Sequence, residues 1–203
     1  EKPDRGSGIQ CLLKQIPHVG KPLVRPTTCD GHHRMTNAAD PIRLGHVHLK
    51  VRRLDLAIDF YREALGLRVV ERVGDEFAFL SFGAAHHDVA LQALGDRAGA
   101  AAPGAVGLYH VAFECRDASE LLSRWDALQA RGRVVGVDHG ISWALYATDP
   151  DGNGIEVCLD RRVAGGRSAW RGQSSSLERS RVERAASEGR ATEPLEHIPS
   201  GGF

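Results

Sequence analysis

Histidine is the residue type in this chain with the clearest potential for chemistry. The 203 residues include 10 histidines, against 3 tyrosines and 3 tryptophans. Histidine is the commonest metal ligand in proteins and readily exchanges protons near neutral pH. Two of the ten, His46 and His110, begin similar apolar runs that read HVHL and HVAF. Metal binding and proton transfer are therefore the chemistries that the rest of the sequence must support.

These two histidines occupy equivalent positions in an internal repeat. Residues 44–66 alternate apolar and polar side chains, as a strand does, and then take the spacing of an amphipathic helix. Gly66 is expected to end this helix in a left-handed conformation. The pattern recurs 64 residues later, from position 46 to position 110. Three strand-like runs follow each helix: 67–72, 77–82 and 87–91 in the first copy, and 133–137, 142–147 and 154–159 in the second.

The repeat predicts an α+β fold. Two βαβββ modules, about residues 44–94 and 107–160, can bury their apolar faces by forming one cupped mixed sheet with the helices outside. The concave side would then hold a small-molecule site. Before the last strand, residues 149–154 read DPDGNG, and the residue types of this segment favour a tight hairpin turn.

The two modules are expected to form a single domain over residues 41–162. Residues 1–40 contain four prolines and no sustained periodicity, and residues 163–203 are rich in Ser, Arg, Glu and Gly, so both are expected to be disordered extensions. Segment 178–190 could form a polar helix, but it shows no apolar stripe that would dock. The only methionine is Met35, which leaves open whether it is the true start.

Composition argues against several functional classes. The 26 basic and 26 acidic residues cancel, so no overall charge favours nucleic acid or an anionic membrane. The four cysteines lie far apart without a CxxC pair, which argues against a structural zinc site or a disulfide framework. The sequence also shows no apolar run of about 18 residues and no recognisable leader. A cytoplasmic protein with neither membrane nor nucleic-acid partners is expected.

Strand alternation predicts which side chains face the cup. The helix must cover the branched apolar face of each first strand, so His46 and His110 should point to the opposite face. Glu156, on the last strand of the second copy, is expected on that same side. Two histidines and one carboxylate form a facial triad that suits an ion such as Fe(II). His48 shares a face with His46 and is the competing ligand, and each residue taken singly is more often an ordinary surface residue.

Five segments resemble the vicinal oxygen chelate superfamily, which comprises glyoxalases, bleomycin-resistance proteins and dioxygenases. They read GHVHLKV, DFYREALGL, HHDVAL, GLYHVAFE and DHGISWALYATDPDGNGIEV, and the resemblance covers about residues 43–161. Within the superfamily, the chain is most similar to the extradiol catechol-type ring-cleaving dioxygenases. This resemblance implies that His46, His110 and Glu156 hold a metal, which would be Fe(II) or alternatively Mn(II).

The resemblance also implies roles for three further residues. His87 would act as acid and base near bound oxygen, His139 would hydrogen-bond a substrate oxygen, and Tyr146 would lie beside a substrate hydroxyl. His86 is the alternative to His87, because a one-residue change of register reverses which side chain faces the cup. Each also has a structural interpretation without chemistry. His87 or His86 would cap a strand, His139 would be an exposed loop residue, and Tyr146 would be a core aromatic.

The function implied is metal-dependent cleavage of a small catecholic aromatic by O2, with a homodimer as an accompanying possibility. One rival is a glyoxalase-type isomerase or lyase, which takes a second carboxylate from the last strand of the first copy. That strand offers only Asp88, which is predicted to face away. The other rivals are a thiol transferase on the same metal scaffold and a metal-free protein that binds a small molecule such as bleomycin.

Overall fold

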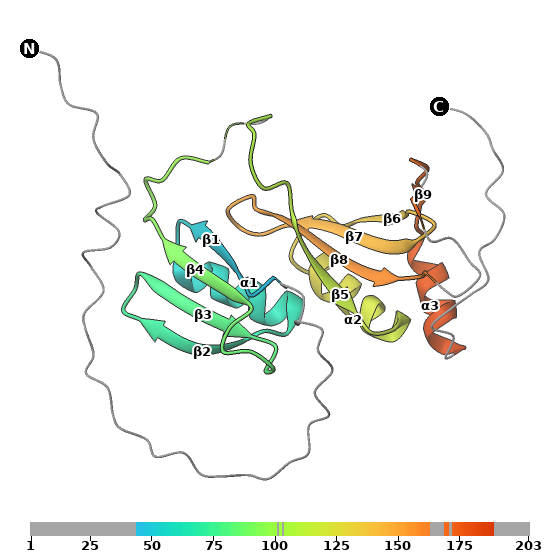
Figure 1. Ribbon diagram of the computed structural model, residues 1–203, viewed down its shortest axis with the longest axis horizontal. Coiled ribbons are helices and arrows are strands. Elements are labelled where there is room, and N and C mark those ends of the chain that lie inside the picture. Colours follow the sequence, from blue (N-terminus) through green and yellow to red (C-terminus); the bar gives the residue numbers. More distant parts are fainter. Residues whose placement is uncertain (1–43, 101, 103, 163–168, 171, 189–203) are drawn as a thin grey trace, which may run out of the picture. The chain divides into compact units, whose positions relative to one another are not determined.

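The computed structural model describes residues 44–100, 102, 104–162, 169–170 and 172–188. Its elements follow the order βαβββ twice, and a short strand and a third helix come after them (Figure 1). The expected N-terminal extension, with Met35, lies outside the described residues. None of the helices in the described part of the chain has the length and apolar character that a membrane span requires.

The first module is a four-stranded sheet with one helix. Its elements are β1 (Val47–Val51), α1 (Leu54–Leu65), β2 (Arg68–Val73), β3 (Phe77–Ser81) and β4 (Val89–Ala93). The strand order is β1-β4-β3-β2, and only the β1–β4 pair is parallel. α1 ends at Gly66, whose φ of 77° is left-handed, so the predicted glycine cap is confirmed. The buried face of α1 packs with Leu49 and Val51 of β1 in the core.

The second module repeats this plan. Its elements are β5 (Val111–Cys115), α2 (Ala118–Gln129), β6 (Val135–Asp138), β7 (Ser142–Thr148) and β8 (Gly154–Asp160). The order β5-β8-β7-β6 matches that of the first sheet, and β5 and β8 are again parallel. Asp117 caps α2, because its side chain accepts a hydrogen bond of 2.8 Å from the backbone N–H of Glu120. Leu121, Trp125 and Leu128 form the buried face of α2.

The α+β fold with two βαβββ modules is therefore confirmed, with one difference in the sheet. The strands form two hydrogen-bonded sheets rather than one, and β1 and β5 are edge strands. The modules meet through α1 and α2 instead, and their buried side chains form one hydrophobic cluster. Arg124 of α2 also reaches across to the Ala64 carbonyl at 3.4 Å. Side-chain packing thus joins the two modules, where a continuous hydrogen-bonded sheet was expected.

Strand register shows which residues of the two modules correspond. Val47 lies opposite Val89 in the first module, and Val111 lies opposite Ile155 in the second. The first strands are therefore offset by 64 positions (47 to 111) and the last strands by 66 (89 to 155). We call two residues counterparts when they hold the same register position in the two modules.

This register gives Glu156 an alanine as its counterpart. Ala90 lies opposite His48 in β1, as Glu156 lies opposite Ala112 in β5. On the neighbouring antiparallel strand, Tyr146 pairs with Glu156 and Phe79 pairs with Ala90, so Tyr146 and Phe79 are counterparts too. Because the offset changes from 64 in the first strands to 66 in the last strands, these pairs are recognised only when the two modules are compared by strand register.

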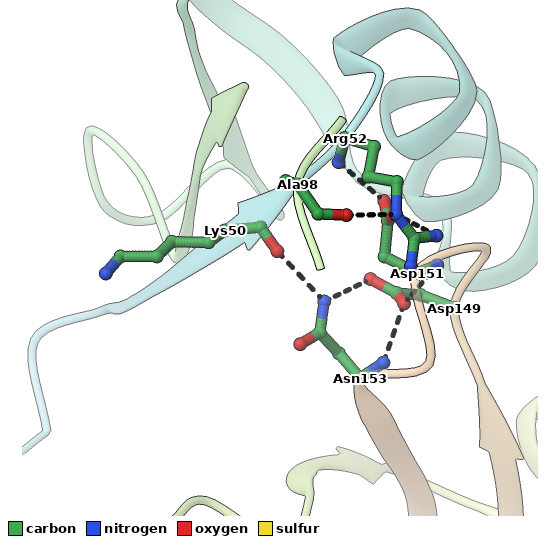
Figure 2. A network of polar contacts seen from close by, with 6 residues as sticks. All are labelled: Lys50, Arg52, Ala98, Asp149, Asp151 and Asn153. Carbon is green, nitrogen blue, oxygen red and sulfur yellow. Dashed lines mark hydrogen bonds and ion pairs between the residues drawn. The ribbon is translucent and has the colours of Figure 1, made fainter. Parts of the chain in front are cut away.

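The DPDGNG turn between β7 and β8 is a contact between the modules as well as a hairpin. Arg52, just after β1, donates to Asp151 from its backbone N–H at 3.1 Å and from its guanidinium at 3.2 Å (Figure 2). Asn153 donates through its side-chain amide to the Lys50 carbonyl at 3.4 Å. We call Arg52, Asp149, Asp151 and Asn153 the hairpin clamp.

Asp149 is the centre of the hairpin clamp. Its side chain is only 4% exposed and accepts hydrogen bonds from the backbone N–H groups of Asp151 and Asn153 and from the Asn153 amide, at 2.8 to 2.9 Å. The Tyr61 hydroxyl of α1 donates to the same carboxylate at 3.1 Å. Burial, and then the Asp149 charge, raise the pKa of Tyr61. The clamp therefore fixes the end of β1 and the start of β8 relative to each other.

Within the expected C-terminal extension, residues 163–203, the structure describes residues 169–170 and 172–188, and these include a strand and a helix. The rest of this extension lies outside the described residues. Strand β9 (Ser175–Ser176) pairs with β6, and helix α3 (Arg179–Ser187) packs against α2. The expectation that no apolar stripe would dock is wrong, because Leu177, Val182 and Ala185 are each at most 3% exposed. This stripe is short and lies among charged residues, so the polar composition hid it.

Candidate functional site

Two of the three predicted metal ligands lie together at the edge of the second sheet. His110, just before β5, has its Nε2 atom 2.7 Å from Oε2 of Glu156 on β8. Glu156 is 9% exposed and lies opposite Ala112 in the β5–β8 pair. The Nδ1 atom of His110 is buried and has no hydrogen-bond partner among the described residues. A histidine nitrogen and a carboxylate oxygen at this separation suit either one direct hydrogen bond or joint binding of a cation.

Gly154 gives His110 its place beside Glu156. A Cβ atom at position 154 would collide with the Tyr109 carbonyl and would lie 3.1 Å from the His110 Cβ. Only glycine therefore permits β5 to enter so close to the start of β8. The sequence marks this glycine as a turn residue, whereas the structure shows that it also accommodates the backbone of the histidine.

Tyr146 and His139 extend the same cluster. The Tyr146 ring lies 5.6 Å from the His110 ring between centroids, and Tyr146 is the cross-strand partner of Glu156. His139, just after β6, has its Nε2 atom 2.9 Å from the Tyr146 hydroxyl oxygen. Burial, and then the charge of Glu156, raise the pKa of Tyr146 to about 12. The tyrosine is thus a neutral hydrogen-bond donor at physiological pH.

A separate group of histidines lies on the first module. The His46 and His87 rings are 4.4 Å apart between centroids, and Phe79 packs edge-on against His87 at 5.1 Å. The Nδ1 atoms of His86 and His87 lie 3.0 Å apart, and Nε2 of His86 is 3.4 Å from Glu71. Burial, and then the charge of His46, lower the pKa of His87, which favours a neutral imidazole.

The predicted residues are therefore gathered into two groups rather than one. His110, Glu156, Tyr146 and His139 form the second-module group, and His46 and His87 belong to the first-module group. Among the residues that the structure describes, no three His, Cys, Asp or Glu side chains are close enough to share a metal ion. The predicted facing of β1 is confirmed, since His46, His48 and Lys50 are exposed while Leu49 and Val51 are buried.

Two pockets adjoin these groups. A pocket of about 460 Å³ is lined by His110 and Tyr146, together with Tyr109, Arg133 and Val135. A second pocket, of about 600 Å³, lies between β1 and β5 and is lined by residues that include His46, Phe82 and Phe113. Both have the volume of a small-molecule site.

Two residues near the second-module group were missed by the sequence analysis. The Ser174 hydroxyl lies 2.8 Å from Nδ1 of His139, and the Trp170 ring packs edge-on against the His139 ring at 6.0 Å. Both belong to the segment that was expected to be disordered. The only signal for them in the sequence is a tryptophan in an otherwise polar region.

Comparison with known proteins agrees with this architecture. Residues 43–157 match the family model described as "Glyoxalase/Bleomycin resistance protein/Dioxygenase superfamily". A solved glyoxalase/bleomycin resistance protein/dioxygenase domain from Frankia sp. EAN1pec is 24% identical, with a TM-score of 0.54, over 63% of this chain and 98% of its own. That structure supports the fold.

Curated relatives include named ring-cleaving dioxygenases. "Biphenyl-2,3-diol 1,2-dioxygenase 2" of Rhodococcus globerulus is 33% identical over 120 residues, which are 58% of this chain and 63% of that protein. "Catechol-2,3-dioxygenase" of Bacillus subtilis (strain 168) is 32% identical over 137 residues, 67% of this chain and 46% of its own. The chain thus spans about half to two thirds of the length of these relatives. With the repeated βαβββ modules and the match over residues 43–157, the chain belongs to the glyoxalase, bleomycin-resistance and dioxygenase superfamily.

Proposed function

We propose that this chain is a metal-dependent dioxygenase of the extradiol type, which cleaves the ring of a small catecholic compound with O2. One observation carries the proposal: His110 lies 2.7 Å from Glu156, Tyr146 is the cross-strand partner of Glu156, and His139 reaches the Tyr146 hydroxyl. Two of these four residues, His110 and Tyr146, line one pocket. The names of the curated relatives support the same reaction class.

The residues present fit a divalent cation. Imidazole nitrogen and carboxylate oxygen are the donors that non-haem Fe(II) takes, and the 2.7 Å separation in the His110–Glu156 pair brings two such donors together. We propose His46 as the third ligand because it is the repeat counterpart of His110. Fe(II) is the proposed ion and Mn(II) is the alternative. A bound cation would stabilise the negative charge on the catechol oxygens and provide a position for O2.

The remaining side chains would orient the substrate and move its protons. Because the pKa of Tyr146 is about 12, its hydroxyl stays protonated and can donate to an anionic substrate oxygen at pH 7. His139 lies within hydrogen-bond distance of this hydroxyl and would hold it in place. His87, with its lowered pKa, would be neutral and able to accept a proton.

One observation disfavours the glyoxalase alternative. That chemistry needs a second carboxylate at the first-module position that corresponds to Glu156, and this position holds Ala90, which is 1% exposed. The whole of β4 reads VALQA and contains no carboxylate. Asp88, just before β4, is engaged by the Phe82 backbone N–H at 2.7 Å and by Ser81 at 3.1 Å.

Metal content and oxygen uptake together test the proposal. The full chain, loaded anaerobically with Fe(II), should retain about one ion and consume O2 with at least one member of a catechol panel that includes biphenyl-2,3-diol. His110→Ala and Glu156→Gln should lose both the metal and the activity. Glu63→Gln, on the exposed face of α1, is the matched control and should lose neither.

Three results would overturn the proposal. The first is Fe(II)-loaded wild-type protein that consumes no O2 with any catechol. The second is substoichiometric metal that is the same in wild type, His110→Ala and Glu156→Gln, which would favour a metal-free binding protein. The third is turnover of a glutathione hemithioacetal with Ni(II) or Zn(II), which would favour the glyoxalase class.

A further inference from the structure

The pocket beside His110 and Tyr146 carries a single permanent charge, that of Arg133. Among the described residues that line this pocket of about 460 Å³, none is Asp, Glu or Lys. The other lining side chains are apolar or uncharged, and they include Val135. Glu156 lies against His110 and is not one of the lining residues. A ligand in this pocket therefore meets a guanidinium with no lining carboxylate to oppose it.

Arg133 lies just before β6, on the face of the sheet that carries Tyr146. Val135 pairs with Tyr146 in the β6–β7 ladder, and residues two apart along an extended chain share a face. Both Arg133 and Val135 line the pocket, in agreement with this alternation. At about 3.3 Å per residue, Arg133 is displaced by roughly 7 Å along the chain from the level of Tyr146. An aromatic ring whose oxygens lie at Tyr146 and His110 can thus direct a short substituent toward the guanidinium.

The guanidinium of Arg133 is available to a ligand. Arg133 is exposed, and within the described part of the chain its side chain forms no hydrogen bond or ion pair. It also borders a neighbouring pocket that contains Asp149, but that carboxylate is buried and accepts four hydrogen bonds from other groups. An arginine without an internal partner can bind a carboxylate through two parallel hydrogen bonds.

The pocket between β1 and β5 has the opposite charge. Its described lining includes three carboxylates, those of Asp88, Glu114 and Glu120, and one arginine, Arg116. The Arg116 guanidinium already donates to Glu120 at 3.1 Å. An anionic ligand is therefore disfavoured there and favoured in the pocket of Arg133.

We propose that Arg133 is a specificity-determining residue, which selects catechols that carry a carboxylate on the ring or on a short side chain. This inference rests on the proposed function and names the substrate class of that same site. The ring lies beside Val135, with its hydroxyls toward His110 and Tyr146 and its carboxylate on Arg133. Because Arg133 is remote from the reacting oxygens, it stabilises bound substrate and transition state equally, and so affects KM rather than kcat.

Binding is measured with a matched pair of probes, 3,4-dihydroxybenzoate and its neutral isostere 3,4-dihydroxybenzamide. Anaerobic calorimetry on the Fe(II)-loaded full chain excludes ring cleavage and so reports binding alone. Wild-type protein should bind the benzoate about tenfold more tightly, as expected for one partly solvated pair of opposite charges joined by hydrogen bonds. Arg133→Gln should lose this preference. Arg133→Lys should retain part of it, because lysine keeps the charge without the paired donors.

Arg131→Gln is the matched control. Arg131 is also exposed and lies two residues earlier, but it borders only the neighbouring pocket. This variant should keep the preference for the benzoate. Both glutamine variants should unfold at the wild-type temperature, because each replaces an exposed side chain that has no ion pair among the described residues.

Turnover separates the inference from the proposed function. Arg133→Gln should raise KM for the benzoate about tenfold, keep its kcat within about twofold, and leave both constants for the benzamide unchanged. Wild-type protein that binds neither probe, or binds both equally, would overturn the inference. So would a preference that survives in Arg133→Gln or disappears in Arg131→Gln, even if both probes are cleaved. A preference that depends on Arg133 without any O2 uptake would support the anion-binding role and contradict the proposed function.

Discussion

The two modules of this protein share one architecture and differ in chemistry. Both have the order βαβββ, the same sheet order and a histidine just before the first strand. Where the second module holds Glu156 and Tyr146, the first holds Ala90 and Phe79 at the counterpart positions. The duplicated scaffold thus provides two equivalent surfaces, and only the second of them carries a carboxylate and a hydroxyl beside its histidine.

This difference shows how a repeat can be retained while its site is made asymmetric. Ala90 and Phe79 make the first surface apolar at these positions, so His87 packs against Phe79 rather than against an acid. Glu156 can be buried in the second because His110 lies 2.7 Å away and offsets its desolvation. Exchanging counterparts between the modules is therefore the sharpest way to examine this difference.

The largest expected effect concerns the carboxylates of the two corresponding loops, Asp149 and Asp88. Asp149→Ala removes four hydrogen bonds, including the one from Tyr61 on the other module, and should lower the free energy of unfolding by about 4 kcal/mol. Asp88→Ala removes two bonds within its own module and should cost about 1 to 2 kcal/mol. Urea unfolding would measure both. Equal losses would mean that Asp149 has no special part in joining the modules.

The next effect comes from giving the second module the aromatic residue of the first. Tyr146→Phe gives position 146 the same residue as its counterpart Phe79 and removes the hydroxyl group by which the two differ. Under the proposed function, kcat should fall about 100-fold, with the metal content unchanged. The control is a change at the counterpart position of the first module: Phe79→Leu should alter KM by a few-fold and kcat little. Steady-state oxygen uptake distinguishes them, and a Tyr146→Phe variant with wild-type kcat would remove Tyr146 from the chemistry.

A smaller effect is expected from the glycines that neighbour the two repeat histidines. Gly154→Ala forces a Cβ against the Tyr109 carbonyl and the His110 backbone and should cost about 2 kcal/mol. A Cβ atom at Gly45, next to His46, would meet nothing within 4 Å, so Gly45→Ala should cost less than about 0.5 kcal/mol. Thermal unfolding and Fe(II) binding would report the difference. Similar losses of stability and of Fe(II) binding in both variants would show that the placement of His110 does not depend on the close contact of its backbone with Gly154.

The smallest effect concerns Cys115, whose counterpart at an offset of 64 is Val51. Burial raises the pKa of Cys115 from 9.0 to about 12. The stabilisation from the protonated thiol is therefore complete below pH 9 and is lost as the pH rises toward 12. Between about pH 8 and about pH 9.7, wild-type protein should lose roughly 1 kcal/mol more stability than Cys115→Val. Parallel urea curves at both pH values would contradict this.

The periodicity of the sequence was sufficient to predict the modules. Alternation at His46, His48 and Lys50 placed these residues on the face away from α1, and their exposure confirms it. Gly66 as the end of α1 and the hairpin before β8 are also found as predicted. These features depend on contacts within about ten residues, which is the range that a local pattern reports.

What the sequence did not reveal depends on contacts over long separations. The two-residue change of offset between first and last strands arises from loop lengths, so the Ala90 counterpart of Glu156 could not be seen by simple superposition. The docking of α3 rests on Leu177, Val182 and Ala185 within a charged segment. The distance between His46 and His110 is set by how the modules pack, which no repeat spacing determines.

The hairpin clamp also has a consequence for the order of folding. Its bonds between the modules, with that of Tyr61 to Asp149, join residues 88 to 103 positions apart in the sequence, so they can form only after each module has assembled its own strands. Contacts made that late are absent from the folding transition state, and losing them accelerates unfolding rather than slowing folding. A chevron analysis of Arg52→Ala, which removes the guanidinium bond to Asp151, should therefore show an unchanged folding limb and a raised unfolding limb. A turn that forms locally thus governs the lifetime of the native state.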